Sequence, residues 1–258
     1  MSEGEPLRLE VKGGVGRITL TRPQSGNTID VAMARALMEA ALAVDEDDEV
    51  RAVVLTGEGK LFCGGGDVQT FASAGDSVPA RIKEITGPLG VAVARLARMN
   101  KPLLTLINGP AAGAGLSLAV LGDIALAART AHFTMAYTAI GLTPDGGASW
   151  LLPRLVGLRR AQELVLTNRR LSADEAAEWG LITRVVDDLA GEGARVAAQL
   201  AVGATSALGS ARRLLLSSFD TSLETQMELE ARSISDHART PHGREGIAAF
   251  LAKRAPVF

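Results

Sequence analysis

The pattern of apolar and polar positions changes its period several times along the chain, and each change predicts an element. Residues 7–11 and 16–20 alternate around Gly13-Gly14, which predicts a β-hairpin. Apolar residues between Ile29 and Val44 recur at the helical period, and Asn27-Thr28 are placed to open that helix. Continuous apolar runs predict buried strands at 50–56, 103–107 and 181–186.

Strands and helices alternate up to about residue 190, and only helices are predicted beyond it. A Gly- and Pro-containing connection at 72–79 leads to a helix over 80–99, and Ser172 to Glu175 have capping-box spacing. Pro241 breaks the last stretch before a final helix near 243–253. The pattern predicts an α/β core at 1–190 and an α-helical region at 191–258.

The composition of the chain limits the classes of protein to which it can belong. A chain of 258 residues with 47% hydrophobic residues can bury a substantial core. A net charge of −2, 3% aromatics and the lack of a prominent Lys/Arg cluster give no case for nucleic-acid binding. One cysteine, no signal-like N-terminus and no run long enough to span a membrane predict a cytoplasmic protein. The three histidines lack metal-ligand spacing, and the acidic run 45–49 predicts a solvated corner, so no metal site is expected.

Two turns rich in small residues carry the candidate chemistry. One, at 108–119, follows the strand 103–107 and enters a helix, and the other, at 61–68, follows the strand 50–56. Each turn can present a backbone N–H without a side chain in the way, so the two together could hold one carbonyl oxygen in an oxyanion hole. The alternative is that these glycines only permit tight turns.

The paired turns resemble the crotonase, or enoyl-CoA hydratase/isomerase, superfamily over nearly the whole chain. Matching motifs run in order from Ile18–Pro23, through both turns, to Leu152–Gly157 and Ala249–Arg254. The resemblance implies an α/β spiral of ββα units and C-terminal helices that build a homotrimer or a dimer of trimers. It places the two oxyanion donors on the backbone N–H groups of Gly66 and Ala114.

The resemblance also implies an acyl-coenzyme A thioester as substrate, with coenzyme A as part of that substrate and no separate cofactor. The predicted substrate- and coenzyme A-binding residues are Gln24, Gly64, Gly65, Asp67, Val68, Tyr137, Phe250 and Lys253. For Asp67 a structural role in its own turn is favoured, and Lys253 could equally be a solvated helix end. Tyr137 and Trp150 could line the acyl pocket or belong to the core.

The acid/base groups near the oxyanion hole determine which reaction it would support. The two glutamates of the hydratases correspond here to Ser117 and Tyr137, neither of which is a carboxylate, so ordinary hydration is disfavoured. Asp145 lies where hydratases have glycine, in an apolar setting that should raise its pKa toward neutrality, and it is predicted to be the catalytic base. A helix N-cap is the structural alternative for Asp145.

The segments around Gly113, Asp145 and Trp150 resemble most closely the branch of 1,2-epoxyphenylacetyl-CoA isomerases. This resemblance implies an isomerase that converts the epoxide to an oxepin or moves the double bond of a 3-enoyl-CoA to the 2-position. Other functional hypotheses stay open. The chain could catalyse aryl-CoA dehalogenation, naphthoyl-CoA ring closure or hydration by an unconventional pair of acid/base groups, or it could be a non-catalytic acyl-CoA-binding protein.

Overall fold

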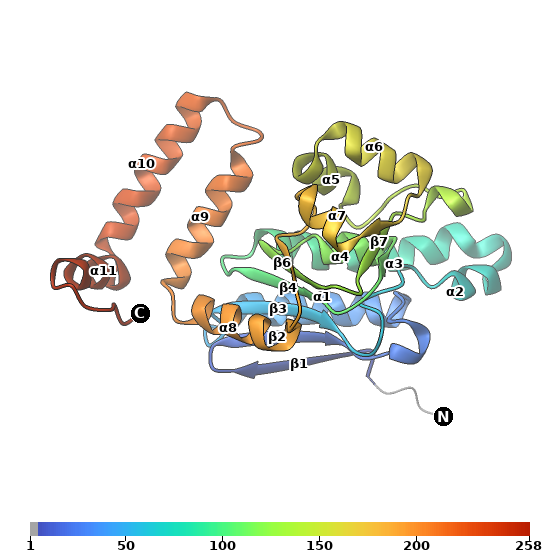
Figure 1. Cartoon of the computed structure of the whole chain (residues 1–258), viewed down its shortest axis with the longest axis horizontal. Coiled ribbons are helices and arrows are strands. Elements are labelled where there is room, and N and C mark those ends of the chain that lie inside the picture. Colours follow the sequence, from blue (N-terminus) through green and yellow to red (C-terminus); the bar gives the residue numbers. More distant parts are fainter. Residues whose placement is uncertain (1–4) are drawn as a thin grey trace.

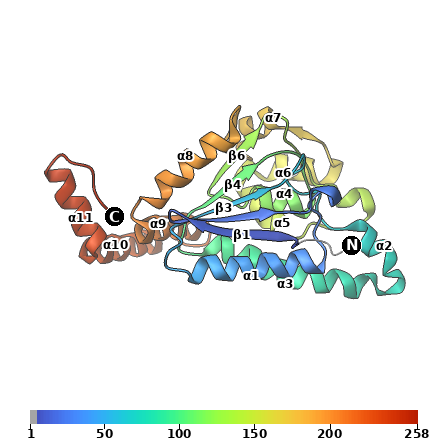
Figure 2. The ribbon, with the colours of Figure 1, turned by 90° about the horizontal axis from the view of Figure 1, so that it is seen from below.

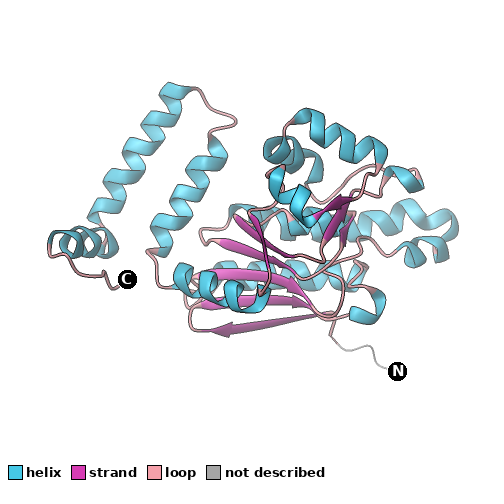
Figure 3. Ribbon diagram, viewed as in Figure 1, coloured by secondary structure: helices cyan, strands magenta, loops and turns pink. Residues whose placement is uncertain are grey.

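Two β-sheets organise the chain in the computed structural model, which describes residues 5–258 (Figure 3). The larger sheet has the strand order β1-β2-β3-β4-β6-β9, in which β1 is antiparallel to β2 and the other neighbours are parallel. Its strands are β1 (Leu7–Lys12), β2 (Val15–Leu20), β3 (Ala52–Gly57), β4 (Leu103–Ile107), β6 (Ile124–Ala128) and β9 (Arg184–Val186). The smaller sheet has the order β5-β7-β8 and comprises β5 (Ala111–Ala112), β7 (His132–Thr134) and β8 (Leu171–Ser172).

Helices cover both faces of the larger sheet because its central strands are apolar on both sides. Along β3, Val53 and Leu55 face one hydrophobic core while Val54 faces another, as the alternation of a strand requires. Helices α1 (Val31–Glu46) and α3 (Val78–Arg98) lie on one face, and α8 (Leu189–Ala201) lies on the other (Figure 2).

Shorter helices complete the core and carry the loops between strands. They are α2 (Val68–Ser73), α4 (Ala114–Ala119), α5 (Ala148–Val156), α6 (Leu158–Thr167) and α7 (Ala173–Glu178). Three 3₁₀ turns accompany them, at η1 (Pro23–Ser25), η2 (Gly75–Ser77) and η3 (Thr138–Ile140). Helix α4 is buried along its whole length, so its backbone lies in the middle of the molecule.

The last three helices extend away from the sheets, at the end of the molecule opposite α2 (Figure 1). They are α9 (Thr205–Ser217), α10 (Leu223–Arg239) and α11 (Pro241–Leu251). The buried Arg212 anchors α9, because its guanidinium donates to the carbonyls of Leu96 and Met99 and to the Asp123 carboxylate. Beyond this anchor, large apolar side chains of α10 such as Leu223 and Ile234 are exposed.

The structure confirms most of the predicted elements. The hairpin, the strand at 103–107 and the long helix after residue 78 are present, and Ser172 and Glu175 form a complete capping box. Helices alone follow residue 190, although α8 packs on the larger sheet with β2, β3, β4 and β6. The boundary at residue 190 between core and helical region therefore stays a prediction.

Four predicted boundaries were wrong for local reasons. Asp30, not Asn27, caps α1, because the Asp30 carboxylate accepts the Met33 N–H. The connection 72–79 contains the end of α2 and the turn η2, and the strand expected at 181–186 is only Arg184–Val186. The break between α10 and α11 lies where it was predicted, but α11 begins at Pro241 itself and not near residue 243, which suits proline because a first-turn residue needs no N–H partner.

Asn27 is instead a buried clamp on the turn after β3. It adopts a left-handed conformation with φ of 54°, and its side-chain amide donates to the carbonyls of Glu58, Leu61 and Phe62 at 3.0, 3.0 and 3.1 Å. Its side-chain oxygen accepts the Arg22 N–H at 2.9 Å. The position of the glycine turn at 64–66 therefore depends on this side chain.

Replacing Asn27 by Ala should lower the free energy of unfolding by about 1–3 kcal/mol, because buried carbonyls lose their donor. Urea denaturation followed by circular dichroism measures this change. The control is Glu39→Ala on the exposed face of α1, which should stay within about 0.5 kcal/mol of the wild type. Equal stability of the Asn27 and Glu39 variants would contradict the clamp.

Candidate active site

A cavity of about 290 Å³ lies where the two glycine-rich turns meet. The turn after β3 contributes Gly64, Gly65 and Gly66, and the start of α4 contributes Gly113 and Ala114. The remaining wall comes from α2, α3 and the loop before α5, with Val68, Phe71, Ile82, Thr86, Ala136, Tyr137, Ile140, Leu142, Thr143, Pro144 and Asp145. Segments that are far apart in the sequence thus enclose one largely apolar site.

Backbone contacts fix the distance between the two turns. Cys63 and Ala111 form a parallel bridge, in which the Ala112 N–H donates to the Cys63 carbonyl at 3.0 Å. The approach leaves no room for side chains: a Cβ on Gly65 would lie 2.7 Å from the Ala112 oxygen, and one on Gly115 would lie 2.2 Å from the Cys63 oxygen. Close packing therefore requires glycine at both positions, and at Gly65 the positive φ of 92° requires it as well.

The amides of Gly66 and Ala114 remain available at this junction. Within residues 5–258, neither N–H has an acceptor among the protein's own groups, whereas Gly64, Gly65 and Gly113 all donate to protein atoms. Ala114 is the first residue of α4, so its N–H cannot have an intrahelical partner. Two unpaired donors beside one cavity can stabilise an anionic oxygen, which is the arrangement of an oxyanion hole.

Asp145 lies on the loop between η3 and α5 and lines the same cavity. The cap of α5 is Gly147, without a side-chain cap, so the N-cap alternative for Asp145 is wrong. Its carboxylate accepts a hydrogen bond from the Tyr137 hydroxyl. Burial raises the pKa of Asp145 above its ordinary value, and the Tyr137 hydrogen bond opposes that rise only in part.

Ser117 and Tyr137, which the resemblance matched to the hydratase glutamates, both lie next to Asp145. Tyr137 lines the cavity, and burial together with the Asp145 charge raises the pKa of its phenol, so the hydroxyl stays protonated. Ser117 is fully buried on α4, and its hydroxyl donates to the Asp145 carbonyl at 3.2 Å. Among the described residues that line the cavity, Asp145 is the only carboxylate.

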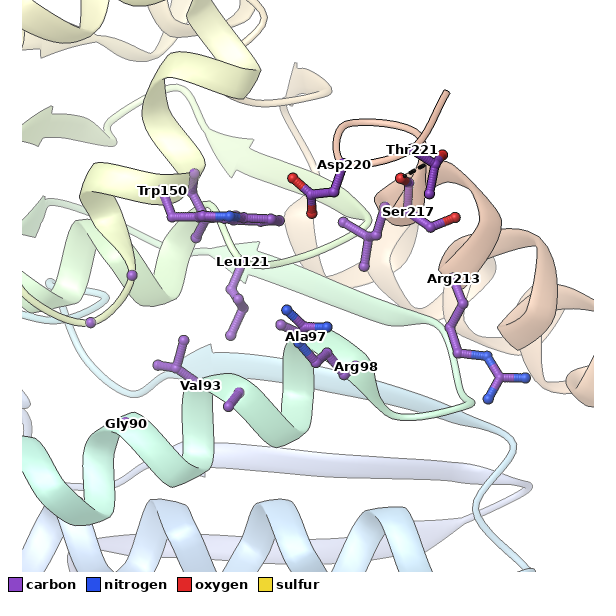
Figure 4. A pocket seen from close by; sticks show the side chains of 15 residues that line it. Gly90, Val93, Ala97, Arg98, Leu121, Trp150, Arg213, Ser217, Asp220 and Thr221 are labelled. Atoms are coloured by element: carbon purple, nitrogen blue, oxygen red, sulfur yellow. Dashed lines mark hydrogen bonds between the residues drawn. The ribbon is translucent and has the colours of Figure 1, made fainter. Parts of the chain in front are cut away.

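A larger cavity of about 700 Å³ lies between α3, α5 and α9 (Figure 4). The loop before α5 borders both cavities, because Asp145 lines the smaller one and Gly146 and Gly147 line the larger one. Trp150 belongs to this second cavity and not to the wall around Asp145, and the Arg154 guanidinium lies 4.1 Å from the centre of its ring.

The other predicted binding residues divide into two groups. Gly64, Gly65, Val68 and Tyr137 line the cavity. Four others do not line it in the single chain: the exposed Gln24 of η1, Asp67, and Phe250 and Lys253 at the end of α11. The Asp67 carboxylate caps α2 by accepting the N–H groups of Gln69 and Thr70, as the structural alternative predicts.

The lone cysteine lies beside the site without joining it. Cys63 is fully buried, its thiol donates to the Asn27 carbonyl at 3.1 Å, and burial raises the pKa of that thiol to about 12. Within residues 5–258, no three His, Cys, Asp or Glu side chains gather as a set of metal ligands. No helix in this part of the chain is long and apolar enough to cross a bilayer.

Apart from Val68, the helical part of the wall was not predicted from the sequence. Phe71 of α2 and Ile82 and Thr86 of α3 enclose the cavity. The spacing of four between Ile82 and Thr86 indicates one helix face, but that spacing does not show whether the face meets the core or a cavity. Asn27 was also missed as a clamp, since it was interpreted as part of a helix start.

Comparison with known proteins agrees with this geometry. The model of the family described as enoyl-CoA hydratase/isomerase matches residues 10–258. The chain belongs to the enoyl-CoA hydratase/isomerase family. Its crotonase fold is shared with the crystal structure of an enoyl-CoA hydratase from Polaromonas sp. JS666, which has a TM-score of 0.92 and 34% identity over 97% of this chain and 98% of that one.

Two curated relatives from the same family are named for different reactions. The 1,2-epoxyphenylacetyl-CoA isomerase of Escherichia coli strain K12 is 41% identical over 96% of each chain. A 4-chlorobenzoyl coenzyme A dehalogenase of Arthrobacter sp. is 35% identical over 96% of this chain and 91% of that protein. Like these members of the family, the chain is an acyl-CoA enzyme of the isomerase, hydratase or dehalogenase type.

A methyl group at Gly65 should disturb the hole without removing either donor. Gly65→Ala places a Cβ against the Ala112 carbonyl, and turnover of an acyl-CoA thioester should fall by about 100-fold, as for loss of one oxyanion donor. Gly13→Ala is the matched control, since Gly13 also has a positive φ but open space around it, and its activity should be unchanged. Steady-state kinetics of both variants measure the effect, and circular dichroism confirms that both fold. A folded and fully active Gly65 variant would refute the oxyanion hole formed by the two turns.

Proposed function

We propose that this member of the enoyl-CoA hydratase/isomerase family is an acyl-CoA isomerase with Asp145 as its single base. The observation that carries the proposal is the composition of the cavity. Two unpaired amides, of Gly66 and Ala114, share it with one carboxylate, and the positions of the hydratase glutamates hold Ser117 and Tyr137. One base suffices when the same proton leaves one carbon and returns to another.

The proposed reaction moves a double bond through an enolate. The thioester oxygen accepts the N–H groups of Gly66 and Ala114, and the Asp145 carboxylate removes a proton from the carbon next to the carbonyl. The electron pair of that C–H bond delocalises onto the thioester oxygen, where the two amides stabilise the charge. Asp145 then returns the proton two carbons away, so a 3-enoyl-CoA becomes a 2-enoyl-CoA with no net gain or loss of atoms.

Two observations support this chemistry for Asp145. Burial raises its pKa, which brings a carboxylate closer to the range in which it can both take and give a proton. The similarity to the Escherichia coli protein supports a further substrate, 1,2-epoxyphenylacetyl-CoA, whose isomerisation to an oxepin would use the same hole. In both cases coenzyme A is part of the substrate, and the proposal needs no separate cofactor.

Dehalogenation of an aryl-CoA is the second candidate, because the Arthrobacter relative is a dehalogenase. In that reaction Asp145 would attack the ring carbon as a nucleophile, displace halide and form an aryl ester. Mass spectrometry of protein quenched during turnover distinguishes the two, since only dehalogenation adds the aryl-acyl mass to the chain. Hydration is less well supported because a second carboxylate is absent from the described cavity wall.

Assembly of copies is part of the proposal. The exposed Phe250 and Lys253 lie at the end of α11, opposite α2 in the single chain (Figures 1 and 2), so coenzyme A contacts from them require a second copy. We propose a homotrimer or a dimer of trimers in which the exposed apolar residues of α10 and α11 are covered. Such an interface would bring the end of α11 to a neighbour's site.

Asp145→Asn should abolish isomerisation while leaving the fold intact. The amide cannot take the proton, so the rate with 3-enoyl-CoA should fall by about 100-fold or more. The rise in absorbance of the conjugated thioester follows the reaction directly. Thr143→Val, at a nearby uncharged position on the same loop, is the control and should lose far less activity. Turnover that survives in the Asp145 variant would disprove the assignment of the base.

The rate should also depend on pH through Asp145. The base form is lost as the pH falls through the pKa of this group, which burial raises, so kcat/KM should decline on the acid side at a pH above the ordinary carboxyl range. A pH profile with 3-enoyl-CoA measures the midpoint. An acid limb at the value of an exposed aspartate would contradict a buried base.

A further inference from the structure

The hydrogen bond between Tyr137 and Asp145 joins the segment before η3 to the segment before α5. The phenol hydroxyl donates to one carboxylate oxygen, Oδ1. Within the described residues, no other residue donates a hydrogen bond to the second oxygen, Oδ2. The contact therefore makes the two oxygens of Asp145 unequal.

The surroundings of the pair give the phenol no other titratable partner. In the described part of the cavity wall, Asp145 and Tyr137 are the only titratable groups, and the rest of that wall is apolar, glycine or threonine. Behind the pair, Ser117 on α4 is uncharged and binds the Asp145 main chain. Because burial and the neighbouring carboxylate both raise the pKa of Tyr137, the phenol keeps its proton and acts only as a donor.

We propose that Tyr137 is a positioning residue, which holds Oδ1 of Asp145 and leaves Oδ2 as the oxygen that carries the proton between the two substrate carbons. This inference rests on the proposed function. A carboxylate that is free to rotate presents either oxygen in many directions, whereas transfer from one carbon to another two positions away needs one oxygen within reach of both. A donor on Oδ1 limits that rotation and so favours the geometry of transfer.

The same contact sets the ionisation of the base. Burial raises the pKa of Asp145, and the Tyr137 hydrogen bond lowers it, because the bond stabilises the carboxylate form. Removal of the hydroxyl therefore has two separable effects. The base loses its orientation, which slows proton transfer at every pH, and its pKa rises further, which moves the acid limb to higher pH.

Tyr137→Phe removes the hydroxyl and keeps the ring. With 3-enoyl-CoA, kcat should fall by about 10- to 100-fold while KM changes by less than about twofold, since misplacement affects transfer more than binding. The acid limb of the kcat profile should move to higher pH. Thr138→Val is the matched control: it deletes the next hydroxyl, which donates to the Val165 carbonyl, and should leave kcat and the acid limb unchanged.

A measurement that needs no turnover tests the contact itself. Tyr137 is the only tyrosine of the chain, so protein grown with tyrosine labelled with ¹³C at Cζ gives one resonance for this carbon. That resonance should shift with pH as Asp145 ionises, and the step should vanish in Asp145→Asn. A resonance without a step in the wild type would overturn the positioning role.

The outcomes separate this inference from the function on which it rests. If Asp145→Asn is inactive but Tyr137→Phe keeps both kcat and its acid limb, Asp145 remains the base and the positioning role is wrong. If Asp145→Asn retains full turnover, the proposed function fails and the positioning role fails with it. The inference is supported if both variants lose activity and the acid limb of the kcat profile of Tyr137→Phe lies at higher pH than that of the wild type.

Discussion

The close approach of two backbone turns is the constraint on which the site depends. The turn after β3 and the segment before α4 touch without intervening side chains, and Gly65 and Gly115 are the residues that allow the contact. The bridge between Cys63 and Ala111 aligns the two segments as neighbouring strands would be aligned. As a result, the free amides of Gly66 and Ala114 are held by rigid main chain, and no side-chain entropy is lost when they receive a ligand oxygen.

The sheet supplies the rigidity behind those turns. Strands β3 and β4 are adjacent and parallel, so their carboxyl ends lie at one edge, and each glycine-rich turn follows one of them. Apolar residues on both strand faces bind α3 on one side and α8 on the other. The proposed base, Asp145, lies on a different segment, the loop before α5, which is attached to the buried α4 through Ser117. The proposed oxygen-binding amides and the proposed base thus belong to separate parts of one packed core.

The sequence predicted the parts of this arrangement that local patterns encode. Strand runs, the hairpin, the capping box at Ser172 and both glycine turns are visible as periodicity or composition, and the resemblance of the turns pointed to the correct family. Long-range packing was not visible. Nothing local shows that Asn27 holds carbonyls more than thirty residues away, or that Ile82 faces a cavity. The hydrogen bond from Tyr137 to Asp145 depends equally on how two loops fold against each other.

The burial of Cys63 has a practical consequence. Thiol reagents attack the thiolate, and a group with a pKa of about 12 and no exposed surface offers almost none at neutral pH. The folded protein should therefore react with thiol reagents as little as a protein without cysteine, although Cys63 immediately precedes the glycine turn of the candidate active site. A cysteine introduced at an exposed position of α10 would be the one site to receive a fluorophore or spin label, and association of the C-terminal helices could be followed without altering the native residue.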